Sequence, residues 1–150
     1  MNFNSMDEIL TFAIEKEEKS AFFYKLLAAK AKNDHIKKAL IEFANEEMGH
    51  KAKLEQIKAG KKINPDKEKI QDLKISEILQ EVIITEDIDY QQALTIAMKE
   101  EKAAYTLYMK LASLTDNQEQ KDIFEMLARE EAKHKLRFEL EYDDHIMQEA

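Results

Sequence analysis

The chain has 150 residues, enough for one domain (residues 1–150) with a continuous hydrophobic core. It contains no cysteine, which excludes disulfides, Cys-ligated zinc and iron–sulfur clusters within these residues. The formal net charge is −8 and no basic run stands out, which argues against a nucleic-acid binder. Two Gly, one Pro and abundant Glu, Lys, Ala and Leu favour an all-α protein. Because no signal-peptide pattern or membrane-length apolar run is seen, we expect a soluble, cytoplasmic protein that makes no use of a membrane.

The first predicted helix covers residues 5–31. It begins at Ser5, and Glu8 three residues later completes the spacing of a capping box. The side chains predicted to face the core follow each other at steps of three and four: Leu10, Ala13, Glu17, Ser20, Tyr24, Leu27 and Ala31. A carboxylate therefore stands in the middle of the buried stripe.

The second predicted helix covers residues 35–59, with Asn33 and Asp34 as capping residues and Gly60 as its end. Its stripe reads Ile36, Leu40, Phe43, Glu47, His50, Leu54 and Ile57. Glu47 and His50 form a Glu-x-x-His motif, whose two side chains lie on one helix face about a turn apart. Ionisable groups again occupy core positions.

Residues 60–89 are predicted to form a long crossover, with a loop at 60–65 and a short amphipathic helix at 75–84. A connection of this length allows the second helical hairpin to dock in a different direction from that of a simple up-down-up-down chain. The Ile-rich face of the short helix suggests an interface, and we expect a homo-oligomer, most simply a dimer.

The third and fourth predicted helices cover residues 90–114, capped by Asp89, and residues 118–142. Their stripes read Leu94, Ala97, Glu101, Ala104, Tyr108 and Leu111, and then Phe124, Leu127, Glu131, His134 and Phe138. The tail from Asp143 is expected to be frayed.

The two halves of the chain are related by an internal repeat. Glu131 lies 84 positions after Glu47, and His134 lies 84 positions after His50. The same offset relates further pairs: Ala13 and Ala97, Glu17 and Glu101, Tyr24 and Tyr108, Leu27 and Leu111, Ala28 and Ala112, Ala44 and Ala128, Glu46 and Glu130. The repeat predicts a four-helix bundle made of two duplicated helical hairpins.

Six ionisable residues on the inward stripes make an ordinary core impossible: Glu17, Glu47, His50, Glu101, Glu131 and His134. A buried carboxylate without compensation costs several kcal/mol, against a total stability of about 5–15 kcal/mol for a domain. Two divalent cations would offset this charge. Ligand sets rich in oxygen, with one imidazole per metal, suit iron or manganese, and zinc is an alternative. Taken singly, any of these Glu residues is more often a solvated surface residue.

Other candidate residues have simpler explanations. Glu18 competes with Glu17, but its repeat partner is Lys102 and it lies off the stripe, so we expect it at the surface. His35 and His145 stand at helix ends without repeat partners, which favours surface or capping roles. Two tyrosines, Tyr24 and Tyr108, are either plain core aromatics or residues whose hydroxyls bond a ligand carboxylate from another helix, because buried hydroxyls need partners.

With Ala13-x3-Glu17-x6-Tyr24, the two Glu-x-x-His motifs and Ala97-x3-Glu101-x6-Tyr108, the chain resembles the rubrerythrin branch of the ferritin-like superfamily over residues 5–142. The resemblance implies a ferritin-like fold and a di-iron centre. Glu47 and Glu131 would bridge the metals, Glu17 and Glu101 would be terminal ligands, and each His would bind one iron. Glu46 and Glu130 stand at the family position just before each bridging Glu. There they would either accept the far N–H of His134 and His50 respectively, orienting the rings, or lie on the exposed helix surface.

The chain departs from that family pattern in two respects. Full-length rubrerythrins carry a Cys-rich rubredoxin domain, and these residues contain no cysteine. Rubrerythrins proper also carry a further Glu one turn after the third-helix ligand, where this chain has Ala104.

The leading functional prediction is a di-iron oxidoreductase, a peroxidase or oxidase that reduces hydrogen peroxide or dioxygen with electrons from an external donor protein. A second hypothesis is a ferroxidase that handles iron as ferritins do, which would require a closed shell of many subunits. A third is a non-enzymatic scaffold in which the metals only stabilise the bundle.

Overall fold

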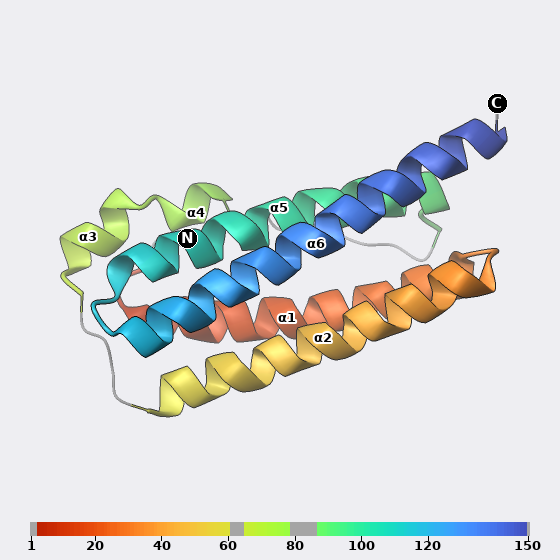
Figure 1. The fold of residues 1–150 in the computed structure, drawn as a ribbon. Helices are drawn as coiled ribbons and strands as arrows, with labels where there is room; N and C mark the ends of the chain where they lie inside the picture. Colours follow the sequence, from red (N-terminus) through yellow and green to blue (C-terminus); the bar gives the residue numbers. More distant parts are fainter. Residues whose placement is uncertain (1–2, 61–64, 79–86, 150) are drawn as a thin grey trace. The chain divides into compact units, whose positions relative to one another are not determined.

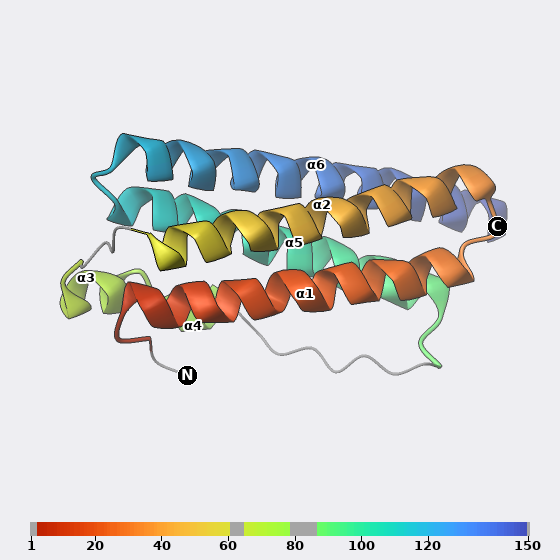
Figure 2. The same cartoon turned by 90° about the horizontal axis from the view of Figure 1, so that it is seen from below.

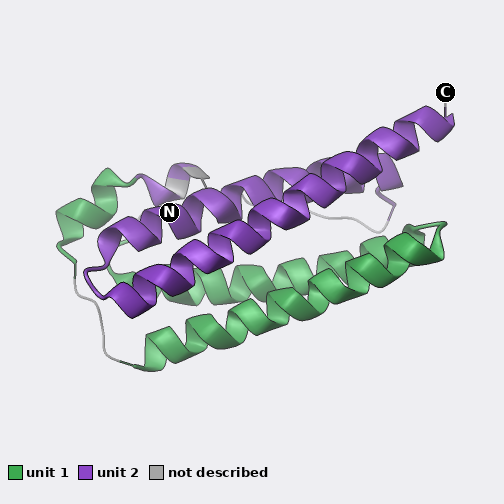
Figure 3. Ribbon diagram, viewed as in Figure 1, with its two compact units in different colours: residues 1–73 green, residues 74–150 purple. Residues whose placement is uncertain are grey.

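The computed structural model describes residues 3–60, 65–78 and 87–149. All regular secondary structure in these segments is helical, which confirms the predicted all-α class. The chain divides into two compact units, Met1–Leu73 and Lys74–Ala150, which are coloured separately in Figure 3. The prediction that residues 1–150 form one domain stays a prediction.

The first unit is built on a hairpin of two helices, α1 (Met6–Lys30) and α2 (Asp34–Ala59), which run side by side (Figures 1 and 2). Both start at side chains that accept backbone N–H groups, which are otherwise unsatisfied in a first helical turn. Ser5 Oγ accepts the N–H of Glu8 at 3.2 Å, and Asn33 Oδ1 accepts that of His35 at 2.7 Å. The predicted boundaries, 5–31 and 35–59, are therefore correct to within one residue.

The capping box predicted at Ser5 forms only in part. The Glu8 carboxylate accepts the N–H of Asn4 at 2.8 Å instead of that of Ser5, so the reciprocal bond of the box reaches one residue further back. Phe3 is buried, and its ring packs against that of Phe12 with centroids 5.5 Å apart. The start of α1 therefore carries both the Phe3–Phe12 ring contact and the hydrogen bond from Asn4 N–H to Glu8.

The stripes predicted for α1 and α2 are the buried faces of the hairpin. Nearly every member is buried, and the two exceptions, Ser20 and Phe43, are half-buried. On the outer side, Lys51 Nζ of α2 pairs with Glu18 Oε1 of α1 at 2.9 Å. This bond raises the pKa of Lys51 and shows Glu18 at the surface, as predicted.

The connector contains two short helices, α3 (Lys67–Asp72) and α4 (Ile75–Ile78). Leu73 and Lys74 separate them, and the φ of 51° at Lys74 lies in the left-handed region. The sequence predicted only one helix, at residues 75–84. Helix α3 was missed because six residues are too few to show a clear apolar periodicity, and of these only Ile70 is buried. Residues 61–64 of the predicted loop and residues 79–84 of the predicted helix lie outside the described segments.

The second unit repeats the hairpin with α5 (Tyr90–Leu114) and α6 (Gln118–Glu149). Here Asp89 and Gln92 form a complete capping box at the start of α5. At the turn before α6, Asn117 Oδ1 accepts the N–H of Gln120 at 3.0 Å. The predicted range of 90–114 for the third helix is confirmed.

The fourth helix does not end at Tyr142, and the prediction of a frayed tail from Asp143 is wrong. Helix α6 continues to Glu149, and Tyr90 at the start of α5 contacts the extension. Tyr90 donates its hydroxyl to Glu141 Oε1 at 2.9 Å, and its ring lies 5.1 Å from that of His145 in an edge-to-face contact. His145 is therefore half-buried instead of serving only at the surface or as a cap.

None of the helices in the described segments is both long and apolar enough to cross a membrane.

Candidate metal centre

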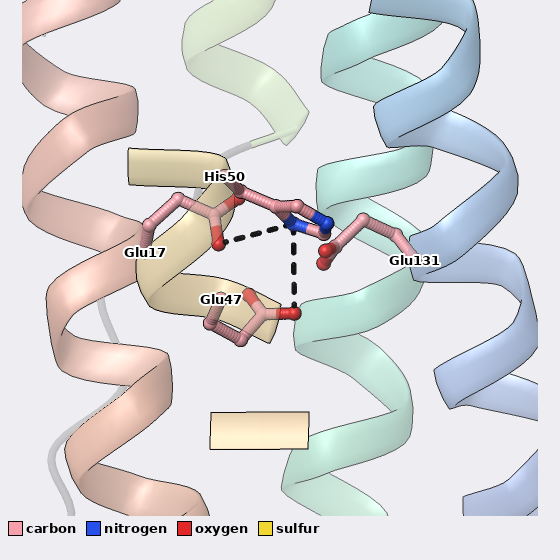
Figure 4. A group of neighbouring side chains, drawn as sticks. All are labelled: Glu17, Glu47, His50 and Glu131. Carbon is pink, nitrogen blue, oxygen red and sulfur yellow. Dashed lines mark ion pairs between the residues drawn. The ribbon is translucent and has the colours of Figure 1, made fainter. Parts of the chain in front are cut away.

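In the first unit, one residue of α1 and two of α2 turn their ionisable groups toward each other. His50 Nδ1 lies 3.6 Å from Glu17 Oε2 and 3.8 Å from Glu47 Oε1, as the dashed lines in Figure 4 mark. The three side chains each offer one ligand atom, and these atoms all lie within 4.8 Å of one another. The first hairpin thus gathers two carboxylates and one imidazole at one level.

The helix register produces this cluster. Glu17 stands in the buried stripe of α1 between Ala13 and Tyr24, both 0% exposed. Glu47 and His50 are one turn apart on α2, so both point to the same side. The exposed fractions of Glu17, Glu47 and His50 are 3%, 1% and 2%, far lower than is usual for charged residues.

The second unit contains the equivalent cluster. Glu101 lies on α5, and Glu131 and His134 lie one turn apart on α6. Their exposed fractions are 1%, 1% and 2%, and His134 Nδ1 lies 3.7 Å from Glu101 Oε2. Again the three residues can offer ligand atoms within 4.8 Å of one another. The internal repeat seen in the sequence is therefore also a repeat of side-chain geometry.

The separations between donor atoms suit ligands that share a metal ion. A distance of 3.6–3.8 Å is longer than a hydrogen bond, whose usual range ends near 3.2 Å. Two donors at this spacing, each about 2.1 Å from a common ion, would subtend an angle of roughly 120–130° at that ion. The three side chains of each unit could therefore hold a metal ion between their ligand atoms.

The nature of the donors narrows the choice of ion. In each unit the set is two carboxylates and one imidazole, without sulfur, which fits iron, manganese or zinc better than copper(I) or an iron–sulfur cluster. The Nδ1 atom of each His and one oxygen of each Glu are sealed from solvent. Divalent cations would compensate the buried negative charge, which is otherwise costly.

The remaining predicted site residues are placed as follows. Tyr24 and Tyr108 are 0% and 1% exposed, which fits both proposed roles, and the hydrogen bond from each hydroxyl to a ligand carboxylate stays a prediction. Glu46 is exposed and Glu130 is half-buried. Their predicted bonds to His134 and His50 also stay predictions. Ala104, at the position of the family's further Glu, is half-buried.

Within the segments that the structure describes, the groups of side chains able to hold a metal contain only the six residues already singled out in the sequence. Sequence reasoning thus missed no ligand candidate there. What it did not reveal was the role of Tyr90, Glu141 and His145 in ordering the end of α6, because single residues 51 or more positions apart carry no periodic signal.

Comparisons with known proteins agree with this geometry. A family model described as rubrerythrin matches residues 8–142. Among solved structures, a hypothetical protein from Pyrococcus furiosus is similar at 28% sequence identity and a TM-score of 0.70, covering 91% of this chain and 87% of that one. A search of curated proteins gave no match. The family match confirms the predicted ferritin-like fold class, and it spans both hairpins and all six ligand candidates.

Proposed function

Because the chain belongs to the rubrerythrin family, we propose that it is a di-iron carboxylate oxidoreductase that reduces hydrogen peroxide or dioxygen with electrons from an external donor. One observation carries the proposal. Each of the two units buries two carboxylates and an imidazole whose ligand atoms lie within 4.8 Å of one another. In an ordinary helical core, burying three such groups in each hairpin would cost several kcal/mol of desolvation without compensation.

In this proposal the two clusters jointly hold two metal ions. Glu47 and Glu131 would bridge the ions, and Glu17 and Glu101 would be terminal ligands. His50 and His134 would each bind one ion through Nδ1, the atom that faces the carboxylates in its own unit. The four carboxylates would balance the four positive charges of two divalent ions, which leaves a neutral set compatible with burial.

Bound ferrous ions would supply the two electrons that reduce hydrogen peroxide, together with two protons, to two molecules of water. The protein's part is to hold the ligand atoms at fixed separations and to exclude bulk water. The buried aromatic and aliphatic neighbours on the same stripes serve that exclusion, among them Tyr24 and Tyr108. Their hydroxyls are proposed to fix the orientation of ligand carboxylates.

Electrons must come from outside these residues. The sequence contains no cysteine, so it holds no Cys-ligated iron that could re-reduce the site. A donor protein is therefore part of the proposal.

Rapid mixing of the anaerobic ferrous protein with hydrogen peroxide tests this function. We expect ferric absorption to appear much faster in wild type than in a Glu47→Ala, Glu131→Ala variant. A Glu42→Ala, Glu119→Ala variant removes the same charge from exposed positions of α2 and α6 and should react like wild type. Equal rates in wild type and in the Glu47, Glu131 variant would refute the redox role.

The other hypotheses are separate outcomes of related measurements. Sedimentation as a closed shell, with many irons oxidised per chain, would favour a ferroxidase. Zinc in protein from native cells, with no reaction toward peroxide after iron loading, would favour a structural role for the metals.

A further inference from the structure

Helix α6 carries three large apolar side chains on its outer face. Leu136, Leu140 and Met147 are 57%, 53% and 77% exposed. Successive helical residues are about 100° apart, so these three positions lie within about 40° of each other around the helix. Single exposed apolar residues are common on proteins, whereas a row along one helix marks an interaction surface.

The charged residues around this row are distributed unevenly along the helix. Arg129 and Lys133 precede the leucines, and Asp143 and Asp144 follow them, and all four are exposed. The face therefore has a basic end, an apolar middle and an acidic end. We refer to residues 129–147 of this face as the α6 stripe.

From this order of charges we propose that the α6 stripe binds the α6 stripe of a second copy of the chain in antiparallel orientation. A two-fold axis reverses the direction of the second helix, so the basic end of each stripe meets the acidic end of the other. When Leu136 of one copy faces Leu140 of the other, Lys133 comes opposite Asp143 and next to Asp144 of the other copy. Each of these contacts occurs twice by symmetry.

The register with Leu136 against Leu140 is the favourable one. It places the two exposed leucines of one copy against the two of the other and brings Met147 opposite Arg129, whose aliphatic stem can cover it. A parallel pairing would set Lys133 beside Lys133 and Asp143 beside Asp143, which is repulsive. The surface thus specifies both a partner, a second copy, and an orientation.

The extension of α6 is necessary for this surface. Asp143, Asp144 and Met147 lie in the part of the helix that the sequence predicted to be frayed. The Tyr90 hydroxyl bond to Glu141 and the Tyr90 ring contact with His145 hold that part in place within the second unit. The inference does not depend on the proposed redox function, since it uses no metal ligand.

Sedimentation equilibrium of the full chain over a range of concentrations gives the dimer dissociation constant. We expect Leu136→Glu to raise this constant about tenfold or more, because the variant places charge in the apolar middle of the stripe. Met109→Glu is the matched control, since Met109 is 42% exposed on α5, outside the stripe, and should leave the constant unchanged. A wild-type chain that stays monomeric, or a dimer insensitive to Leu136→Glu, would overturn the proposal.

A charge exchange tests the orientation. Lys133→Glu alone or Asp143→Lys alone sets like charges opposite each other, and each should raise the dissociation constant several-fold. The double variant restores opposite charges and should recover most of the wild-type affinity. Additive losses in the double variant would contradict the antiparallel arrangement.

Cysteine pairing tests the register, and the chain is suited to it because it has no cysteine of its own. A mixture of Leu136→Cys and Leu140→Cys chains should form an intermolecular disulfide faster than either variant alone, because only facing positions approach within about 7 Å between Cα atoms. Equal rates for all three samples would exclude this register.

Discussion

His50 Nδ1 lies 3.6 Å from Glu17 Oε2, across the two helices of the first hairpin. The corresponding pair of the second hairpin, His134 Nδ1 and Glu101 Oε2, is 3.7 Å apart. Two segments 84 residues apart in the sequence thus hold the same three side-chain types at nearly the same spacing. In both hairpins these side chains could therefore hold a metal ion.

Metal removal and reloading should report directly on these clusters. We expect chelated protein to bind two ferrous ions per chain and its melting temperature to rise, since saturation at 100 times the dissociation constant adds about 2.7 kcal/mol to the free energy of unfolding. His50→Ala or His134→Ala should each weaken one of the two sites. His35→Ala is the control, because His35 is exposed and should bind metal like wild type. Calorimetric titration measures the number of sites, and unchanged binding in both His variants would contradict the assignment.

The buried carboxylates should destabilise the metal-free protein. Replacing Glu47 and Glu131 by Leu removes two charged groups that are 1% exposed each, and we expect the free energy of unfolding of metal-free protein to rise by about 1–4 kcal/mol. The loaded wild type should remain more stable than the loaded variant, since the variant lacks both proposed bridging ligands.

Thermal unfolding in excess chelator checks this expectation. Glu42→Leu with Glu119→Leu removes the same charge from exposed positions of the same helices and should change stability little. If the metal-free Glu47, Glu131 variant melted below metal-free wild type, the placement of these two carboxylates in the dry core would be wrong.

Substituting the two buried tyrosines by Phe distinguishes a packing role of the ring from a hydrogen-bonding role of the hydroxyl. Tyr24→Phe and Tyr108→Phe preserve the ring and remove the hydroxyl, and both rings are essentially buried. If each hydroxyl bonds a ligand carboxylate, each variant should lose about 1–3 kcal/mol of stability and shift the ferric absorption spectrum. Tyr105→Phe, at a site 40% exposed on α5, should do neither. A spectrum unchanged in both buried variants would leave Tyr24 and Tyr108 as core aromatics only.

Tyr90 gives a pH-dependent prediction at the end of α6. Burial, followed by the hydrogen bond to Glu141, raises the pKa of Tyr90 above its ordinary value of 10.0. In alkaline solution the unfolded chain therefore loses this proton before the folded chain does. The stabilisation is complete below pH 10 and declines as the pH rises further, since the unfolded state then binds fewer protons.

Denaturation at a series of pH values from about 9 to 11 tests this effect. The free energy of unfolding should fall more steeply with pH in wild type than in Tyr90→Phe. Tyr105→Phe is again the control and should follow wild type. Parallel curves for wild type and Tyr90→Phe would mean that the Tyr90 hydroxyl is not held by Glu141 in solution.

The sequence alone was sufficient for the helical class, for the four long helices and for the six ligand candidates. The reason is that burial imposes a period of three to four residues, and on these stripes Glu and His are conspicuous because they are costly there. Each Glu-x-x-His motif alone is weak evidence for a metal site, and the shared offset of 84 residues makes the combined set strong evidence. Glu18 could be set aside by the same reasoning, and the structure places it at the surface in an ion pair with Lys51.

Only the tertiary structure showed where helix α6 ends and which helices the connector between the two hairpins contains. The continuation of α6 to Glu149 is accompanied by individual contacts, such as that of Tyr90 with His145, which leave no repeating pattern in the sequence. Helix α3 is too short to show such a pattern. The distances of 3.6–3.8 Å among the ligand atoms likewise follow from how two helices pack within a hairpin. Periodicity tells which side chains turn inward, and packing between helices determines how closely those side chains approach each other.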